Sequence, residues 1–395
     1  MIKFADADVC ETEVKRVMKI EEFQPLLDRI AGRNGLDAVA VVPLANLEGP
    51  LEHTLSRMER GLMPPSYRWT EENTRTGYGY KNYGGWAKAV IVAAKSFYVD
   101  ESRPEDKSRP FGRFARYTWR NNYTFIVRAL RSTVSEIIRE TGIPLKSKVV
   151  SNYTSIPEKV IFSMSGIAGI GKNCTLISPV LGSYFNIGEA FIDLTVEGIE
   201  DFQPPPPDFS MCGSCRLCMD ACPAHAFIDE GVLDINLCFQ YLSENVVPVP
   251  GELRRSWGDR LYGCSTCTDV CPFNSHPLHG KAHDIGFIGT GMDLIQALTM
   301  SDGEWMELVA DNQIGRRDRL AIIKNGILAL GNSGYEGGTS VLTRFLHHDN
   351  TVIRSSAAWA LGESGNGESM RRLEERLEKE NDPTVREEIS SALGR

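Results

Sequence analysis

The clearest chemistry in the sequence lies in a run of cysteines, CGSCRLCMDAC at residues 212–222, which Pro223 follows. Four thiols at these spacings match the pattern C-x2-C-x2-C-x3-C-P, which binds [4Fe–4S] clusters in pairs. In that pattern the fourth cysteine ligates a different cluster from the first three. The run therefore predicts that further ligands lie elsewhere in the chain.

Four more cysteines follow at ligand-like spacings, and Pro272 comes after the last of them. Eight thiolates make two four-cysteine sites, and the crossing rule of two-cluster ferredoxins assigns them. One site is expected to take Cys212, Cys215, Cys218 and Cys271. The other is expected to take Cys222, Cys238, Cys264 and Cys267.

A pair of zinc sites is the alternative, because zinc also accepts four cysteines. In each run a gap of three residues precedes the last cysteine, and a proline follows it. Both are features of ferredoxins, so two [4Fe–4S] clusters are preferred. Cys10 and Cys174 fall outside both patterns and are expected to be free, buried thiols.

Composition narrows the class of protein further. The chain has 395 residues, of which 42% are hydrophobic and 24% charged, and this suits two or three globular domains. Its net charge of −9 gives no general attraction to nucleic acid or to an anionic membrane. The sequence shows neither a signal peptide nor eighteen consecutive apolar residues, so a cytoplasmic protein with reduced cysteines and no membrane partner is expected.

Hydrophobic periodicity predicts a mixed first region. Apolar residues at helical spacing indicate a helix over 123–141, which Gly142 and Pro144 end. The apolar run 89–94 and the segment 184–196 are typical of buried strands. Four prolines at 204–207 predict an extended connector and a domain boundary.

The last region carries an internal repeat. The tripeptide Ala-Leu-Gly begins at residues 329, 360 and 392, and such a period indicates stacked helical repeats of the HEAT type. The fold class is therefore α+β, with three domains. They are a mixed α/β catalytic domain at 1–207, a two-cluster ferredoxin-like domain at 208–300 and helical repeats at 301–395.

Two neighbouring clusters form a path for single electrons. A plain electron carrier needs only the cysteine module, and that hypothesis leaves about two hundred residues before it without a purpose. We therefore expect an oxidoreductase whose chemistry takes place in the first domain. An electron-transfer protein that docks a partner on its repeats is the alternative.

Several segments, in order, resemble the epoxyqueuosine reductases, iron–sulfur enzymes that reduce an epoxide on a modified wobble base of tRNA. Besides the eight cysteines, the resemblance lies in SGIAGIGKN at 165–173, GE at 188–189, CFQYL at 238–242, GELR at 251–254, DRLYGC at 259–264 and ALGN at 329–332.

This resemblance implies a base-off cobalamin in the first domain, because low-potential clusters can generate a strongly reducing cobalt. It also implies a tRNA substrate and an external electron donor of low potential. Reductive dehalogenases share the domain plan, so a corrinoid reductase of a small molecule is the second hypothesis. The cobalamin contacts implied are Asn122, Asn152, Ser155, Gly171, Lys172, Gln240 and Ser265.

Two positions depart from the family pattern. The family carries an aspartate as proton donor where this chain has Asn122, and an aspartate before the Glu-Lys pair where it has Asn152. An amide cannot act as a general acid near neutral pH, so the reaction is expected to differ or to use another acid. The phenols of Tyr117, Tyr123 and Tyr153 are the candidates, and a packing role is the alternative for each.

The RNA-binding surface is also weaker than the resemblance implies. Residues 316–395 contain twelve Lys plus Arg and twelve Asp plus Glu, so the repeats are neutral overall. Basic residues do cluster between the cluster ligands and at the start of the repeats, and they could hold phosphates or simply be solvated. They are Arg254, Arg255, Arg260, Arg316, Arg317, Arg319 and Lys324.

Overall fold

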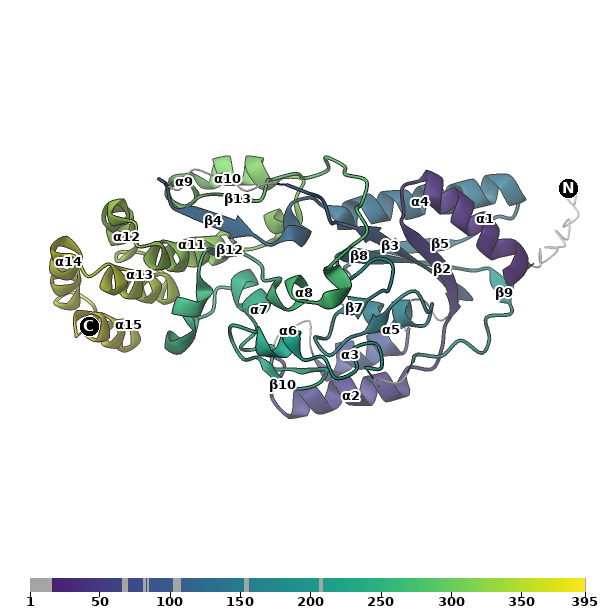
Figure 1. The fold of residues 1–395 in the computed structure, drawn as a ribbon, viewed down its shortest axis with the longest axis horizontal. Helices are drawn as coiled ribbons and strands as arrows, with labels where there is room; N and C mark the ends of the chain where they lie inside the picture. The colour runs from purple at the N-terminus through teal and green to yellow at the C-terminus, as the bar shows by residue number, and fades with distance from the viewer. Residues whose placement is uncertain are drawn as a thin grey trace, which may run out of the picture.

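The computed structural model describes residues 16–65, 70–80, 83, 85–101, 108–152, 156–205 and 209–394. A β-sheet covered by helices lies at one end, the cysteine-rich segment lies in the middle and stacked helices form the other end (Figure 1). The α+β class predicted from the sequence is confirmed. Within these residues, no helix is long and apolar enough to cross a lipid bilayer.

A four-stranded antiparallel sheet of order β2-β3-β8-β5 is the centre of the first region. Every residue of β3 is buried, as expected for the apolar run that predicted it. Residue 188 in β8 has no room for a side chain, because a Cβ there would lie 2.5 Å from the Ile126 side chain. The strands are β2 (Ala38–Pro43), β3 (Ala89–Ser96), β5 (Ser147–Val150) and β8 (Phe185–Ile192).

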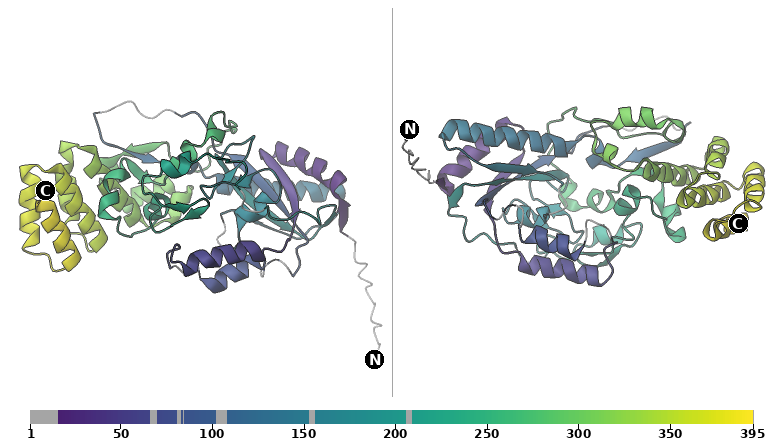
Figure 2. Two further views of the ribbon diagram at one scale, coloured as in Figure 1. Left: turned by 60° about the horizontal axis from the view of Figure 1, so that its bottom comes forward. Right: turned by 180° about the vertical axis from the view of Figure 1, so that it is seen from behind.

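Helices cover both faces of this sheet (Figures 1 and 2). One face packs against α1 and α4, and the other packs against α5. The side chain of Asn121 caps α4, and Gly142 ends it at a φ of 69°, so the predicted helix is confirmed within one residue. The helices are α1 (Ile20–Arg33), α2 (Glu48–Glu59), α3 (Glu71–Tyr78), α4 (Asn122–Thr141) and α5 (Glu158–Ser163).

Two small pairings complete this region. Strands β1 and β9 pair in parallel, and β6 pairs with β7 in an antiparallel hairpin. Of the four prolines, 204 and 205 lie outside helix and strand, while 206 and 207 are outside the described residues. The bounds are β1 (Val17–Lys19), β6 (Gly169–Ile170), β7 (Leu176–Ile177) and β9 (Thr195–Glu197).

The middle region shares a sheet with the first. Strand β4 precedes the predicted boundary at 207, yet it pairs with β12 and β13 from beyond that boundary. The division into three domains therefore stays a prediction. The elements are β4 (Phe111–Phe114), α6 (Leu217–Asp220), β10 (Phe227–Asp229), β11 (Val232–Leu233), α7 (Phe239–Glu244), β12 (Arg260–Tyr262), α8 (Thr266–Asp269) and β13 (Gly291–Asp293).

The repeated Ala-Leu-Gly has a packing cause. A Cβ at Gly331 would lie 2.9 Å from the Cα of Ala360, and one at Gly362 would lie 3.1 Å from the Cα of Ala392. Each glycine thus lets the helix of the next repeat approach closely. The helices are α9 (Leu294–Thr299), α10 (Asp302–Val309), α11 (Arg319–Ser333), α12 (Thr339–Phe345), α13 (Thr351–Ser364), α14 (Gly367–Leu377) and α15 (Pro383–Leu393).

Replacement of Gly331 by alanine tests this packing. Glycine to alanine in a helix normally stabilises a protein by up to about 1 kcal/mol. At Gly331 the added methyl group must push the helices apart, so we expect a loss of about 1–3 kcal/mol in chemical denaturation. Gly394→Ala is the control, because its Cβ would meet only ordinary contacts. A Gly331→Ala protein at least as stable as the wild type would contradict the account.

Candidate functional site: a two-cluster module beside a buried amide

The structure brings the first predicted set of cysteines together around one cavity. Its volume is about 170 Å³, and the β6–β7 hairpin region supplies its other wall through Lys172, Asn173 and Ile177. A single water needs only about 10–15 Å³ of such space, so the cavity suits a cluster better than one zinc ion. The thiols that line it are Cys212, Cys215, Cys218 and Cys271.

The second set also lies together. The Cys238 thiol interacts with those of Cys222 and Cys264, and the Cys267 thiol interacts with the same group. Burial is the main reason that the pKa of Cys238 rises to about 11. Buried thiols of this kind become thiolates when they coordinate a metal centre, because its positive charge replaces solvation. The chemistry of the donors therefore fits a second iron–sulfur cluster.

Cys174 and Cys10 are the two cysteines that belong to neither set. Cys174 is half-buried and has a φ of 60°, and burial raises the pKa of its thiol. It forms no disulfide, in agreement with the expected free thiol. Cys10 lies outside the described residues.

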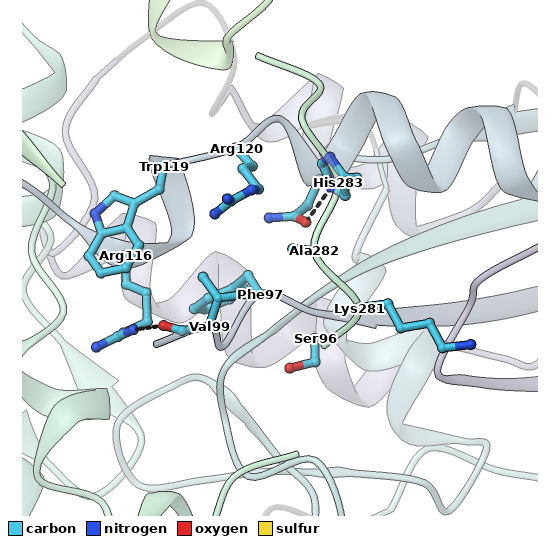
Figure 3. A pocket seen from close by; sticks show the side chains of 10 residues that line it. Ser96, Phe97, Val99, Arg116, Trp119, Arg120, Lys281, Ala282 and His283 are labelled. Atoms are coloured by element: carbon cyan, nitrogen blue, oxygen red, sulfur yellow. Dashed lines mark hydrogen bonds between the residues drawn. The ribbon is translucent and has the colours of Figure 1, made fainter. Parts of the chain in front are cut away.

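Asn122 lies at the first position of α4 and is only 3% exposed. Its Oδ1 is 2.9 Å from the Nε2 of His283, and the ring of His283 stacks on Phe125 with centroids 4.6 Å apart. Figure 3 shows this contact beside the side chain of Arg120. Because an amide oxygen only accepts, the histidine must donate its Nε2–H here.

His283 belongs to residues 276–290, a segment that we call the strap. The strap leaves the cysteine module and crosses the first region, where its backbone forms hydrogen bonds with residues just before Asn122. The amide of Asn121 donates to the Ile285 carbonyl at 2.8 Å, and the amide of Ile288 donates to the Trp119 carbonyl at 3.0 Å. The strap therefore holds the start of α4 in place.

Tyr123 lies next to Asn122, and its phenol is close to three polar side chains. They are Asn186 from β8, Glu158 at the start of α5 and Glu244 at the end of α7. Burial is the largest reason that the pKa of Tyr123 is raised, so this phenol keeps its proton at neutral pH. Of the other predicted phenols, Tyr117 bonds to Gln240 and burial raises its pKa, and Tyr153 is outside the described residues.

The structure separates the predicted cobalamin contacts into two groups. Three are engaged within the protein: Gln240 bonds to Tyr117, Glu244 and Cys264, Ser265 bonds to Asp269, and Lys172 bonds to Gly213 and Glu230. Asn152 is exposed at a φ of 55°, and Ser155 is outside the described residues. A Cβ at Gly171 would lie 2.3 Å from the Ile177 side chain, so packing alone accounts for this glycine.

The basic residues at the junctions are mostly held inside. Lys324 is fully buried and donates to the carbonyls of Leu242, Asn245 and Val247. Arg254 and Arg317 form ion pairs at 2.7 and 2.8 Å with glutamates from other helices. Arg260 is 8% exposed and Arg319 donates to the Ala297 carbonyl, whereas Arg255 and Arg316 are exposed. Most of these basic residues are therefore engaged within the protein, and Arg255 and Arg316 are the exposed members of the set.

Sequence reasoning missed two features of the site. His283 is separated from Asn122 by 161 residues, and nothing in its local sequence indicates their contact. Glu189 is fully buried in β8, and neither oxygen of its carboxyl group has a hydrogen-bond partner among the described residues. A lone glutamate within the apolar strand FNIGEAFI was the signal that could have found it.

Comparison with protein families agrees with this geometry. Residues 211–274 match the model of a 4Fe-4S double cluster binding domain, and residues 320–394 match the model of HEAT repeats. The prediction of two [4Fe–4S] clusters is thereby confirmed. The site and the fold together define an iron–sulfur oxidoreductase.

Individual relatives identify the family. The epoxyqueuosine reductase of Bacillus subtilis is 30% identical over 316 residues, which cover 78% of this chain and 79% of that protein. A solved structure of the Bacillus subtilis enzyme, with an aspartate-bearing catalytic loop swung out of the active site, is 25% identical with a TM-score of 0.82. It covers 95% of this chain and 99% of its own. The chain belongs to the epoxyqueuosine reductase family.

A further structure shares the fold. It is a crystal structure of epoxyqueuosine reductase with an epoxyqueuosine-modified stem loop of tyrosine tRNA. Its TM-score is 0.81 and it is 24% identical, with 95% of this chain and 99% of that chain covered. At this identity the likeness concerns the fold.

The pairing of the cysteines can be tested by substitution. We expect Cys222→Ser to remove the same cluster as Cys264→Ser, and Cys271→Ser to remove the same cluster as Cys215→Ser, because each set surrounds its own site. Electron paramagnetic resonance of the reduced, reconstituted variants distinguishes the two clusters. If the spectrum of Cys222→Ser matched that of Cys215→Ser instead, the crossed assignment would be wrong.

The environment of His283 predicts a pH dependence. Burial, then the charges of Arg120 and Lys95, lower the pKa of His283 to about 4. Its folded pKa is thus below its unfolded value of about 6.5, so the unfolded chain takes up the proton first as the pH falls. We expect the wild type to lose melting temperature relative to His283→Gln between about pH 6.5 and 4. A difference that stays constant over this range would contradict the burial of a neutral ring.

Proposed function

We propose that this protein is a cobalamin-dependent iron–sulfur reductase of the epoxyqueuosine reductase type in which residue 122 is not the proton donor. One observation carries the proposal: the Asn122 side chain is buried and accepts a hydrogen bond from His283. An amide in this position orients its neighbours but has no acidic proton to give. The proton must come from another group of the site.

The residues around the start of α4 fit a corrin. The Oδ1 of Asn186 is buried beside Tyr123 and has no hydrogen-bond partner among the described residues, so an amide N–H of a corrin side chain would satisfy it. Asn122, Asn152 and Ser155 would contact the cofactor, with Gly171 near its edge. Bound there, cobalamin would supply the strongly reducing centre. We propose Gln240, Lys172 and Ser265 as residues that position the clusters and the adjoining backbone.

The chain would contribute electrons and protons. Reduction of an epoxide to an alkene and water consumes two electrons and two protons, and the two clusters would pass the electrons singly. Tyr123 is the described group best placed to donate a proton, since its phenol is neutral and lies next to Asn122. A separate low-potential protein would have to reduce the clusters.

Epoxyqueuosine in tRNA is the first substrate to test, because a relative of the same fold has been solved with that modified stem loop. The internal ion pairs of the junction arginines leave fewer free charges for phosphate than the family resemblance implied. A small molecule reduced by the same cofactor is therefore the second candidate. Salt-dependent binding of the tRNA would favour the first candidate.

An assay with a restored acid tests this proposal. We expect the anaerobically reconstituted wild type to turn over epoxyqueuosine tRNA slowly or not at all, and Asn122→Asp to be at least tenfold faster, since a general acid contributes 10²–10⁴-fold in favourable cases. Asn152→Asp is the matched control, because it restores the other missing carboxylate alone. A wild-type rate equal to that of a relative with the aspartate would contradict the role assigned to Asn122.

A further inference from the structure

A small cavity rich in hydrogen-bond donors lies between the start of α4 and the strap (Figure 3). Its polar wall includes Arg116, Arg120, Asn122, Lys281 and His283, and no carboxylate is among the described residues that line it. Its volume is about 10 Å³, which is room for one water-sized atom. The size and charge of the cavity therefore suit one anionic oxygen of a larger group that stays outside.

Arg120 supplies donors that nothing in the cavity wall satisfies. Its side chain is 12% exposed, and its Nη2 pairs with the Oε1 of Glu101 at 2.5 Å. Its Nε and Nη1 are buried and have no hydrogen-bond partner within the described part of the chain. Figure 3 shows the side chain of Arg120 between those of Trp119 and His283. Buried donors are normally paired, so an anionic oxygen bound here would remove an unfavourable contribution to the free energy.

Asn122 adds a second kind of donor. Its side chain is 3% exposed and lines the same cavity. Because the Nε2 of His283 contacts its Oδ1 at 2.9 Å, the amide has its Nδ2 group left to donate to a ligand. Helix α4 also begins at this residue, and the partial positive charge at its N-terminus adds to that of the guanidinium. Arg120 and Asn122 therefore favour the same kind of ligand atom.

The strap provides an aromatic surface beside these donors. The guanidinium carbon of Arg120 is 4.3 Å from the ring centroid of Phe287, and this ring is 44% exposed. A ring that is covered by a guanidinium on one face offers its other face to a planar group. Proteins that bind single-stranded RNA stack bases on such rings and hold the backbone with basic side chains. The combination favours a nucleotide over a free anion.

We propose that the start of α4 and the strap bind one nucleotide of a single-stranded RNA loop. A phosphate oxygen accepts hydrogen bonds from Arg120 and Asn122, and a base stacks on Phe287. The RNA ligand rests on the proposed function, whereas the unpaired donors and the exposed ring are features of the chain itself. The subsite lies next to residue 122 and not on the helical repeats, in agreement with the internal ion pairs of Arg254 and Arg317.

Binding of the unmodified stem loop of tyrosine tRNA to the reconstituted protein tests the subsite without turnover. Fluorescence anisotropy at several salt concentrations gives the affinity and its salt dependence. We expect Arg120→Gln to bind about tenfold more weakly, because it loses charged hydrogen bonds. The slope of log K against log[salt] should become shallower by about 0.7, the value for one phosphate of a single strand.

The stacking surface has its own variant. Phe287→Leu keeps an apolar side chain but removes the ring, so we expect about tenfold weaker binding with an unchanged salt slope. Phe202→Leu is the matched control, because Phe202 is a second exposed ring outside the strap, and it should have little effect. A Phe287→Leu protein that binds like the wild type would overturn the subsite.

Two further variants distinguish ligand binding from a structural or general electrostatic role. Glu101→Gln removes the carboxylate that shares the guanidinium of Arg120, so the stem loop should bind more tightly. If the ion pair served only the fold, Glu101→Gln would weaken binding or leave it unchanged. Arg316→Gln removes an exposed arginine at the start of the repeats and should have little effect. A loss equal to that of Arg120→Gln would overturn the subsite.

An altered RNA distinguishes a nucleotide from a small free anion. A single uncharged methylphosphonate is placed at each loop phosphate in turn. At one position it should weaken binding to the wild type but not to Arg120→Gln, because both changes remove the same contact. Coupling at no position would overturn the phosphate contact. Binding of inorganic phosphate without binding of the stem loop would assign the cavity to a small anion and overturn the RNA subsite.

These results are independent of the reduction. Iron content and near-ultraviolet circular dichroism confirm that each variant is folded before its affinity is compared. A protein that shows the expected couplings but does not bind cobalamin would refute the proposed function and support the subsite. A protein that binds cobalamin but shows no coupling would refute the subsite alone.

Discussion

The return of Cys271 to the cavity of Cys212, Cys215 and Cys218 is the constraint on which the rest of the structure depends. It closes a loop of chain that also holds the second set of thiols, so the two sites lie in one module. It also fixes where the chain goes next. Soon after Cys271 the strap begins, and it runs across the start of α4.

This connection couples the cluster module to the site in the first region. The strap presents His283 to Asn122, and the side chain of Asn312, just before the repeats, donates to the Gly286 carbonyl of the strap at 2.6 Å. The three regions therefore meet around residue 122. An ionised aspartate would bring a buried negative charge to this contact, whereas the amide accepts the hydrogen bond of His283 without one.

Because residue 122 is not an acid, another group of the site must supply the proton. Burial keeps the phenol of Tyr123 neutral, and burial also raises the pKa of Glu189, whose side chain is fully buried in β8.

The sequence predicts best those parts of the structure that depend on the spacing of residues near one another in the chain. Cysteine spacing gave the two thiol sets, apolar spacing gave α4 and the strands β3 and β8, and the Ala-Leu-Gly period gave the stacked helices. The contact of His283 with Asn122 and the sheet that joins β4 to β12 depend on long-range packing, which no local pattern encodes. The ion-pair partners of the clustered arginines also lie far away in the sequence, so the cluster alone does not tell whether these charges are free.

The central claim is that the two clusters serve a corrin bound beside Tyr123. Its most direct test is to add cob(II)alamin to the anaerobically reconstituted protein and record the electron paramagnetic resonance spectrum. The account predicts a base-off spectrum, in which the splitting from the lower nitrogen ligand is lost, at one cobalamin per chain. A spectrum identical to that of free cob(II)alamin would contradict it.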